Sequence, residues 1–412
     1  MRAVRRLWHA RRRVESPLLT RRGVLAAGLA SLAVGAGGCG GGRATSGEEE
    51  ASLERHRLRE AERSGKGPFG ALRFEGYRGL AKLPWFELDA AGRLRVRGDV
   101  PRAIDLHSHL GMSQGFAPEV DLLEATPRVA YELDCDRDEP PCTIDLDVYM
   151  NTNFTEAMLA ELRSDSIRGL VFGSRAARTH TIPNLVAEMD AAGIERAAVL
   201  PIAFGLPFES DATLHVIDSI EHAGAGGRLV PFASVHPRDE RKREKLRSHA
   251  ARGARGVKLH PEFQRFYPDA PEAMEIYEEC DRLGLPVIFH CGRSGIEPAF
   301  LRSYALPKHF TAALEAFPRV RFLLGHAGAR DMADALPLAK RLPNVFLEVA
   351  SQGASAIAEC IETAGPEKVV FGTDWPFYPV ATSLAKVLIV TEGKPDARVA
   401  VLRGNALSIL SS

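Results

Sequence analysis

The chain has 412 residues, of which 45% are hydrophobic and 26% are charged, a composition typical of a globular protein. Its formal net charge is zero, but eight arginines and one glutamate precede Gly23, so the rest of the chain has 45 basic and 52 acidic residues and a net charge of −7. This balance argues against nucleic acid as a partner. The length allows one large α/β domain or two smaller ones.

The first 38 residues have the pattern of an export signal. Arg21 and Arg22 precede an Ala/Gly-rich apolar segment, 23–38, and together they resemble a bacterial twin-arginine signal peptide. The apolar segment is too short and too rich in glycine for a good transmembrane helix, so we expect no transmembrane domain. Cys39 lies between small residues and resembles the lipidation site of a bacterial lipoprotein, with ordinary cleavage nearby as the alternative. We therefore expect an exported protein, either periplasmic or held at the membrane by a lipid on Cys39.

Residues 39–100 are expected to contain small elements that precede the main domain. The glycine-rich and then charged segment 40–64 predicts a tether and a solvated helix. Two alternating apolar runs around Ala-Ala-Gly in 84–98 predict a β-hairpin that packs on one end of the main domain. The main domain is then expected to span residues 101–412.

After Pro101, short apolar runs rich in β-branched residues alternate with amphipathic helical patterns. This alternation is typical of βαβ units and a parallel sheet. Eight such units match the size of a TIM (β/α)8 barrel, and the absence of a Gly-x-Gly-x-x-Gly turn after the first strand disfavours the alternative, an open doubly wound sheet. The predicted strands are 103–110, 196–202, 229–237, 254–261, 285–292, 321–328, 345–351 and 369–376.

The interval 111–179 is too long to be a plain connection after the first strand. It contains a helical pattern at 155–164 and leaves the carboxyl end of a barrel strand, so we expect it to form a lid or wall over the mouth of the barrel. Cys135 and Cys142 flank a short loop within it, and in an exported chain they could form a disulfide. Cys280, Cys291 and Cys360 lie in apolar contexts and are expected to be buried thiols.

Histidines recur at the ends of the predicted strands. Six of the thirteen occupy such positions, and the eighth strand ends with Asp374. His107 and His109 are two residues apart and should face the same side of their strand. Because the carboxyl ends of barrel strands converge, these side chains should meet, and imidazoles buried together without a metal would leave polar nitrogens unpaired. The six histidines are His107, His109, His236, His260, His290 and His326.

Several imidazoles and one carboxylate suit a divalent transition metal, with Zn²⁺ favoured and Mn²⁺ or Fe²⁺ as alternatives. Such a cation lowers the pKa of a bound water toward 7 and polarises a carbonyl. The sequence therefore predicts a metal-dependent enzyme that acts on a small molecule.

Four ordered motifs resemble the metal-dependent amidohydrolase superfamily: DLHSH at 105–109, VIFHCG at 287–292, LLGHAG at 323–328 and VVFGTDWP at 369–376. The segments GARGVKLHP and NVFLEVAS resemble the amidohydrolase-related (amidohydrolase 2) branch that also contains aminocarboxymuconate-semialdehyde decarboxylase. The resemblance covers about residues 104–410.

The resemblance implies a ligand set for one metal ion and an acid/base pair. It implies that His107, His109, His290 and Asp374 hold the metal and that His326 contacts the hydrolytic water or the substrate. Asp374 is the alternative proton acceptor, and the two residues could share that role.

Four further residues are expected at the mouth. Lys258 resembles the carboxylated lysine that bridges two metals in some superfamily members, and pairing with a carboxylate or contact with substrate is the alternative. His260 shares a face with Lys258. Arg293 could clamp a substrate carboxylate or form a surface ion pair, and Trp375 is expected to shape the pocket.

The leading hypothesis is an exported metal-dependent hydrolase in which metal-bound hydroxide attacks an amide, ester or lactone carbonyl. The alternative is a non-oxidative decarboxylase (carboxy-lyase) or hydratase that acts on an aromatic or unsaturated acid. A lipoprotein that only binds a ligand is a third hypothesis, disfavoured by the intact histidine and aspartate set. The sequence leaves open the substrate and whether the chain forms a homodimer.

Overall fold

Eight parallel strands close into a barrel within the described part of the chain. The strands form two sheets, in the orders β4-β6-β7 and β12-β11-β10-β9-β8. Isolated parallel bridges from Ala233 to Val257 and from Ser108 to Trp375 join the two sheets at both seams. The strands are β4 (Ala103–Ser108), β6 (Ile194–Val199), β7 (Leu229–Pro231), β8 (Val257–Leu259), β9 (Val287–His290), β10 (Phe322–Gly325), β11 (Val345–Glu348) and β12 (Val369–Val370). The predicted TIM barrel and its eight strands are confirmed.

The computed structural model describes residues 43–98, 100–111, 119–206 and 209–411. The expected signal peptide, 1–38, and the expected lipidation site, Cys39, lie outside the described residues. In the part that is described, none of the helices has the length and apolar character needed to cross a membrane.

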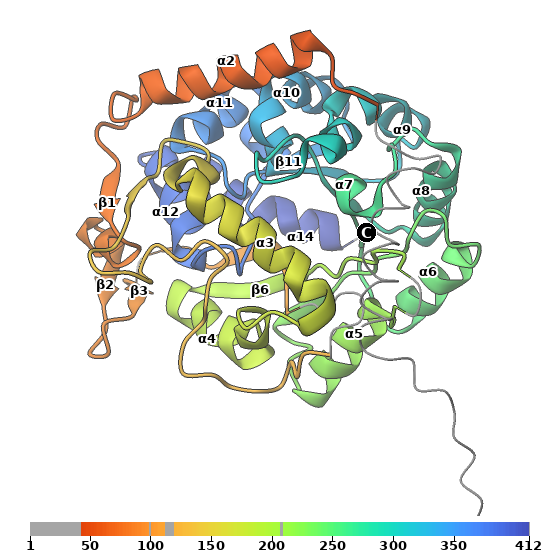
Figure 1. Ribbon diagram of the computed structural model, residues 1–412, viewed down its shortest axis with the longest axis horizontal. Helices are drawn as coiled ribbons and strands as arrows, with labels where there is room; N and C mark the ends of the chain where they lie inside the picture. The colour runs from red at the N-terminus through yellow and green to blue at the C-terminus, as the bar shows by residue number, and fades with distance from the viewer. Residues whose placement is uncertain (1–42, 99, 112–118, 207–208, 412) are drawn as a thin grey trace, which may run out of the picture. The chain divides into compact units, whose positions relative to one another are not determined.

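Helices follow the barrel strands and cover the outside of the barrel (Figure 1). Gly193 and Gly284 follow α4 and α8 in the left-handed conformation, which glycine adopts without strain. The helices that accompany or follow the barrel strands are α4 (Ile182–Ala192), α5 (Ala212–His222), α6 (Lys242–Ala251), α7 (Pro261–Gln264), α8 (Pro271–Leu283), α9 (Thr311–Ala316), α10 (Met332–Arg341), α11 (Ala354–Ala364), α12 (Val380–Val390), α13 (Pro395–Val399) and α14 (Asn405–Leu410).

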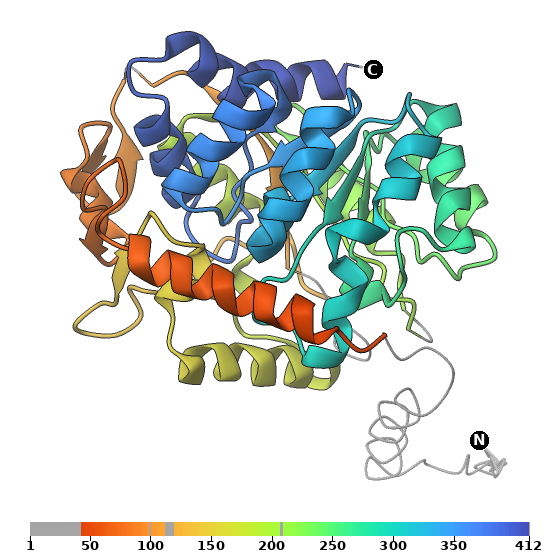
Figure 2. The ribbon, with the colours of Figure 1, turned by 90° about the horizontal axis from the view of Figure 1, so that it is seen from above.

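The apolar core has two layers, because alternate residues of each strand face opposite sides. One layer fills the barrel interior and includes Leu106, Phe232 and Ile288, and α14 packs against it through Ala406 and Ile409. The other layer lies between the strands and the surrounding helices. Figure 2 shows α14 on one side of the barrel and α2 and α3 on the opposite side. The polar residues at the strand ends are therefore free to gather on the side away from α14.

The predicted hairpin is present as β2 (Phe86–Leu88) and β3 (Leu94–Val96), which pair antiparallel. It packs against α4 and α12, as expected for a small element on one end of the barrel. Asp89 stabilises its turn by accepting hydrogen bonds from the backbone of Ala91 and Arg93.

The helix predicted after the tether is α2 (Gly47–Arg63), and most of its residues are exposed, as expected, with only Leu53 and Glu60 buried. A capping box between Ser46 and Glu49 starts the helix. Its buried Glu60 accepts hydrogen bonds from the backbone of Tyr149 at 2.6 Å and from the Thr152 hydroxyl at 2.9 Å. Charged periodicity in the sequence does not reveal that this glutamate docks the helix onto the insertion.

The insertion lies against the carboxyl ends of the barrel strands. It contains β5 (Thr143–Asp145), which pairs antiparallel with β1 (Arg73–Glu75), and α3 (Glu156–Phe172), which extends the predicted helix. Met150 donates its backbone N–H to Ser351 after β11, and the Asn151 amide donates to the Ser294 carbonyl after β9. In Figure 1, α3 crosses in front of the strands. A lid role remains a prediction.

The cysteines follow the expectation. Cys135 and Cys142 form a disulfide within the insertion. Cys280, Cys291 and Cys360 are free and buried.

Candidate metal centre

His107, His109 and Asp374 meet at the mouth of the barrel, where β4 lies beside the end of β12. Asp374 Oδ1 is 3.5 Å from the Nε2 atoms of both histidines. All three side chains are buried. Two ligand atoms bound to one tetrahedral ion at about 2.0–2.2 Å lie about 3.3–3.6 Å apart, and both distances from Asp374 Oδ1 match that separation.

A register shift in β4 brings both histidines inward. Leu106 packs in the barrel interior, and regular alternation would turn the next residue, His107, outward. The pairing of β4 with β6 shifts between Asp105 and Ser108. Asp105 stabilises this irregular segment by accepting hydrogen bonds from the His107 and Thr373 backbones at 2.9 and 3.0 Å. The bulge therefore re-aims a side chain toward the site.

Each histidine of the DLHSH motif is oriented through its Nδ1 atom. His107 Nδ1 is 2.6 Å from Glu348 Oε2, and His109 Nδ1 is 2.7 Å from the Leu200 carbonyl. When Nδ1 carries the proton and donates these bonds, the Nε2 lone pair can bind a metal ion, although in this structure His107 Nε2 lies 3.0 Å from Lys258 Nζ. The orientation is the one that a ligand role requires.

Glu348 is a site residue that sequence reasoning missed. It is fully buried at the end of β11 and also accepts hydrogen bonds from the backbones of His326 at 3.1 Å and Ala350 at 2.5 Å. Burial raises the pKa of Glu348 to about 8, against the opposing effect of these hydrogen bonds. A glutamate that ends an otherwise apolar predicted strand is the signal that could have identified it.

Lys258 projects from β8 into the same centre. Its Nζ atom lies 3.0 Å from His107 Nε2, and burial lowers its pKa to about 8. The structure therefore places Lys258 beside the ligand trio, as the sequence predicted for a mouth residue. Neither the bridging role nor the substrate role of Lys258 is tested by this placement.

His326 follows β10 and borders the trio. One nitrogen or oxygen atom from each of His107, His326 and Asp374 lies within 4.8 Å of the others. His326 Nδ1 is 3.3 Å from the Ala350 carbonyl, and burial lowers the pKa of this histidine to about 4. Its ring is therefore neutral near pH 7.

The backbone at two of these residues is strained. His326 and Asp374 have φ values of 56° and 57°, in the left-handed region that residues other than glycine seldom adopt. Hydrogen bonds hold both conformations: Asp374 N donates to the His107 carbonyl at 2.7 Å, and the Gln352 side chain donates to the His326 carbonyl at 2.7 Å. Strain that persists in this way is typical of functional sites.

By distance, His290 belongs to a group of side chains next to the trio, together with His260 and Glu262. Its Nε2 atom is 3.5 Å from Glu262 Oε2, and its ring stacks on that of His260 with 4.2 Å between centroids. His326 lies next to it, at 4.9 Å between ring centroids. The structure thus brings His260 and His290 together at the mouth, as predicted, and adds Glu262, which sequence reasoning missed. The assignment of His290 to the ion of the trio remains a prediction.

The prediction that Arg293 clamps a substrate carboxylate is wrong. The guanidinium is buried, and it donates to Asp331 Oδ2 at 2.9 Å and to the Glu49 carbonyl of α2 at 2.8 Å. These contacts connect the loop after β9 to the loop after β10 and to α2. Because the charge is already neutralised inside the protein, Arg293 is a structural residue.

Trp375, which is expected from the sequence to shape the pocket, is packed inside the protein. Its side chain is fully buried, and the indole Nε1–H donates to Glu188 Oε1 of α4 at 3.0 Å. His236, one of the six strand-end histidines, caps a strand end: its Nε2 bonds the Gln264 carbonyl at 2.9 Å, and its Nδ1 accepts from the Arg238 backbone at 3.2 Å.

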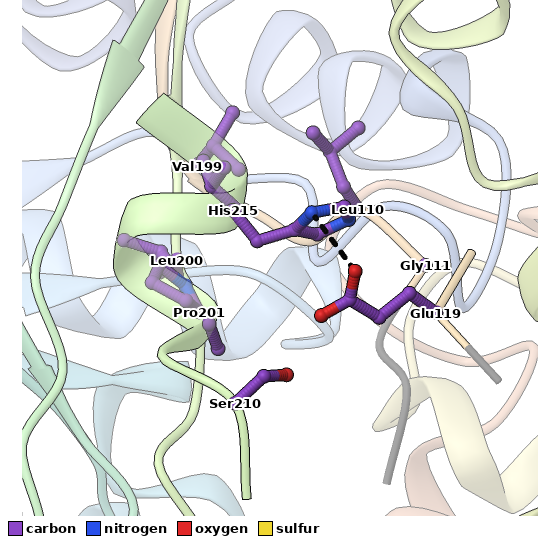
Figure 3. A pocket seen from close by; sticks show the side chains of 10 residues that line it. Leu110, Gly111, Glu119, Val199, Leu200, Pro201, Ser210 and His215 are labelled. Carbon is purple, nitrogen blue, oxygen red and sulfur yellow. Dashed lines mark ion pairs between the residues drawn. The ribbon is translucent and has the colours of Figure 1, made fainter. Parts of the chain in front are cut away.

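Two cavities lie beyond the carboxyl end of β6, and neither is lined by a residue of the trio. The smaller cavity, about 20 Å³, begins at Leu110 and Leu200, beside His109, and is flanked by the ion pair of Glu119 and His215 (Figure 3). That volume holds about one water molecule, so it is no substrate pocket. The larger cavity, about 520 Å³, lies beside His236.

The comparisons with known proteins agree with this fold. A family model described as amidohydrolase matches residues 175–411, and no curated protein matches the chain. An uncharacterised TIM-barrel protein from Bordetella bronchiseptica is 20% identical, covers 76% of this chain and 99% of its own, and has a TM-score of 0.51. This likeness supports the barrel fold alone.

Two further solved structures have TM-scores below 0.5. A 2,6-dihydroxybenzoate decarboxylase from Rhizobium is 17% identical, with 74% of this chain and 99% of that chain covered and a TM-score of 0.47. A probable 2-pyrone-4,6-dicarboxylic acid hydrolase from Acinetobacter baumannii is 12% identical, with 76% and 100% covered and a TM-score of 0.45. Since the family model covers more than half of the residues and the described residues contain histidine and aspartate groups that could bind a metal, the chain belongs to the amidohydrolase family.

Proposed function

We propose that the protein is a metal-dependent hydrolase that cleaves an amide, ester or lactone bond of a small molecule. The observation that carries this proposal is the convergence of the His107 and His109 Nε2 atoms on Asp374 Oδ1, at 3.5 Å each. Two imidazoles and one carboxylate suit Zn²⁺ best among the divalent cations, and Mn²⁺ or Fe²⁺ next.

In this proposal a bound divalent ion supplies an acidified water molecule and polarises the substrate carbonyl. The chain's own residues do the remaining work. Glu348 orients His107 and fixes its tautomer, and the Leu200 carbonyl does the same for His109. His326 is neutral and accepts a proton, and Asp374 can accept one at Oδ2 while Oδ1 faces the histidines.

The export of the protein is a proposal of its own, supported by the arginine pair Arg21 and Arg22 and the apolar segment after it. Replacement of both arginines by lysine should leave the protein in the cytoplasm. If Cys39 carries a lipid, Cys39→Ser should release the exported protein from the membrane fraction. Export unaffected by the double lysine variant would contradict the twin-arginine route.

A paired screen tests the reaction. The purified full chain, depleted of metal and reloaded with Zn²⁺ or Mn²⁺, is offered a panel of esters, lactones and amides and a second panel of aromatic and unsaturated acids with carbon dioxide release as the readout. We expect hydrolysis that a chelator abolishes and that Asp374→Asn lowers by about 100-fold or more. Asp281→Asn, at an exposed ion pair with Arg319, is the control and should keep full activity. Carbon dioxide release without hydrolysis would replace the proposal with the decarboxylase alternative.

A further inference from the structure

Two hydroxyl side chains lie behind His326, and the proposed function uses neither of them. Ser351 Oγ is 3.4 Å from His326 Nδ1, and the same hydroxyl makes a hydrogen bond with the Tyr378 hydroxyl. The three residues follow β10, β11 and β12, so neighbouring strands bring them together. All three side chains are buried. The contacts therefore form a hydrogen-bonded chain that is shielded from bulk water and ends at the ring of the proposed proton acceptor.

The Ala350 carbonyl indicates which ring nitrogen of His326 carries the proton. It lies 3.3 Å from Nδ1, and a carbonyl oxygen can only accept a hydrogen bond. This contact is therefore a hydrogen bond only when Nδ1 is protonated. A neutral imidazole has one N–H, so Nε2 then keeps its lone pair. If Nδ1 were unprotonated, two lone pairs would face each other in a buried region, which is unfavourable.

The Ser351 hydroxyl can support either tautomer of His326, because a hydroxyl can donate or accept. Its single proton, however, serves one partner at a time. When Ser351 donates to the Tyr378 oxygen, Oγ presents a lone pair to Nδ1–H, and that N–H is shared between Oγ and the Ala350 carbonyl. Burial raises the pKa of Tyr378 well above its usual value, and the Ser351 hydroxyl opposes the rise, as a donor to the phenol oxygen does. Tyr378 therefore draws the serine proton away from His326.

The backbone at Ser351 is strained, and the insertion helps to hold it. Ser351 has a φ of 67°, in the left-handed region that favours glycine. The Met150 backbone N–H of the insertion donates to the Ser351 carbonyl at 2.8 Å. The Tyr149 phenol belongs to the same group, since burial and the Asp374 charge raise its pKa and the Ser351 hydroxyl opposes that rise. A residue with a side chain persists in this conformation only where its surroundings hold it, which is typical of a functional position.

We propose that Ser351 and Tyr378 are positioning residues that keep the proton of neutral His326 on Nδ1 and so leave Nε2 as the atom that takes up a proton from the reacting water. The inference rests on the role of His326 in the proposed function and extends it in two ways. It identifies the nitrogen that acts, and it makes the insertion part of the support for this histidine through its contact with Ser351. Both hydroxyls act through the imidazole rather than on the reacting atoms.

Nitrogen NMR measures the tautomer and needs no substrate. The full chain is labelled with isotopic histidine, loaded with Zn²⁺ and studied near neutral pH, and the His326 signals are identified by their loss in His326→Asn. We expect a protonated Nδ1 and an unprotonated Nε2 in the parent protein, and the same pattern after a chelator removes the ion. Tyr378→Phe and Ser351→Ala should each lower the ratio of the Nδ1–H form to the Nε2–H form by about fivefold or more, the effect of one neutral hydrogen bond.

Two further variants separate the hydroxyls from general packing. Tyr277→Phe removes a buried phenol hydroxyl that donates to the Pro268 carbonyl, and it should leave the ratio unchanged. Ser351→Gly removes the same hydroxyl as Ser351→Ala but suits the left-handed backbone, so it should produce the same shift. A parent protein with the proton on Nε2, an unchanged ratio in Tyr378→Phe or Ser351→Gly, or a tautomer that changes when the ion is removed would each overturn the inference.

Kinetics gives a second readout once the paired screen has found a substrate. Ser351→Ala and Tyr378→Phe should lower kcat by about 10-fold, leave KM within about twofold and retain the bound Zn²⁺. A fall in kcat that accompanies loss of the ion or of folded protein would show a structural role and contradict the positioning role. Absence of hydrolysis in the parent protein would refute the proposed function, whereas the tautomer measurement decides the placement of the proton independently.

Discussion

His107 on β4 and Glu348 on β11 are joined by a buried contact of 2.6 Å between Nδ1 and Oε2, although 241 residues separate them along the chain. Glu348 also accepts the backbone N–H of His326. One carboxylate therefore holds the first histidine of the ligand trio and the start of the loop that carries the proposed proton acceptor.

Substitution of Glu348 should weaken metal binding without removing a ligand. We expect Glu348→Gln to lower the affinity for Zn²⁺ by about 10-fold and Glu348→Ala by up to about 100-fold, because the amide oxygen can still accept from Nδ1 whereas alanine leaves His107 free to rotate. Competition with a chelator measures the affinity. Glu279→Gln, a fully buried glutamate paired with Arg247 on the outside of the barrel, is the matched control and should leave the affinity unchanged. An equal loss in the control would mean that the effect is general destabilisation.

Gly372 gives a second way to disturb the same contact. A Cβ atom built on Gly372 would lie 2.1 Å from Glu348 Oε1 and 2.8 Å from the His107 Cβ atom. Gly372→Ala should therefore displace Glu348, lower the free energy of unfolding by about 1–3 kcal/mol and weaken metal binding. Gly226→Ala is the comparison for a glycine without a close neighbour, since nothing lies within 4 Å of its built Cβ atom and, like Gly372, it does not have a positive φ. Metal affinity that is unchanged in Gly372→Ala would contradict the role of Glu348.

The pair of Arg293 and Asp331 should matter for stability rather than for substrate recognition. Loss of one partner leaves a buried charge uncompensated, so Arg293→Met should lower the free energy of unfolding by about 3–5 kcal/mol. Denaturant unfolding of Arg293→Met, Asp331→Asn and the double variant measures the coupling. Once a substrate is found, Arg293→Lys should keep its KM. A large rise in KM with unchanged stability would restore the substrate clamp predicted from the sequence.

Lys386 on α12 should make stability depend on pH. It is buried, and burial lowers its pKa from 10.5 to about 7, while Asp145, Asp147 and Glu60 oppose the shift. Between pH 7 and 10.5 the unfolded chain holds this proton and the folded chain does not, so the free energy of unfolding rises with pH across that window, by up to about 5 kcal/mol from this group. Below pH 7 both forms are protonated and the contribution is flat.

The comparison of Lys386→Met with the parent protein isolates this effect. The stability difference, parent minus variant, should increase from pH 7 to pH 10.5, as measured by urea unfolding at several pH values. Lys394→Met, at an exposed lysine, is the control for loss of one positive charge. A parent-minus-variant difference that stays constant with pH would show that Lys386 remains charged when buried.

The strand ends show how far the sequence could predict the site. His107, His109, His290, His326 and Asp374 all end predicted strands, and the barrel geometry is enough to bring such positions to one face. The partners of these residues were not predictable in the same way. Glu348 and Glu262 are single acidic residues in the sequence, and their roles depend on which side chains lie across the barrel.

Two residues were expected at the mouth of the barrel, but their side chains do not face it. Arg293 and Trp375 lie next to motif residues, and the sequence placed both at the mouth, Arg293 as a substrate clamp or a surface ion pair and Trp375 as a residue that shapes the pocket. The structure turns both side chains away: Arg293 toward Asp331 and Glu49, and Trp375 toward Glu188. Residues that are neighbours along a loop lie close together, but their side chains can point in different directions. The partners of those side chains therefore depend on elements from elsewhere in the chain.

The sequence by itself determined the barrel, its eight strands and the strand-end histidines, because the alternation of apolar runs and helical patterns is a local property and parallel barrels gather their strand ends by geometry. The tertiary structure alone decided which imidazole faces which carboxylate. The irregular register of β4 orients the His107 side chain toward the site. The docked helix α2 supplies a backbone carbonyl that accepts a hydrogen bond from Arg293, and the Glu262 carboxylate faces the His290 ring. These are packing outcomes between distant segments, and local sequence patterns carry no information about them.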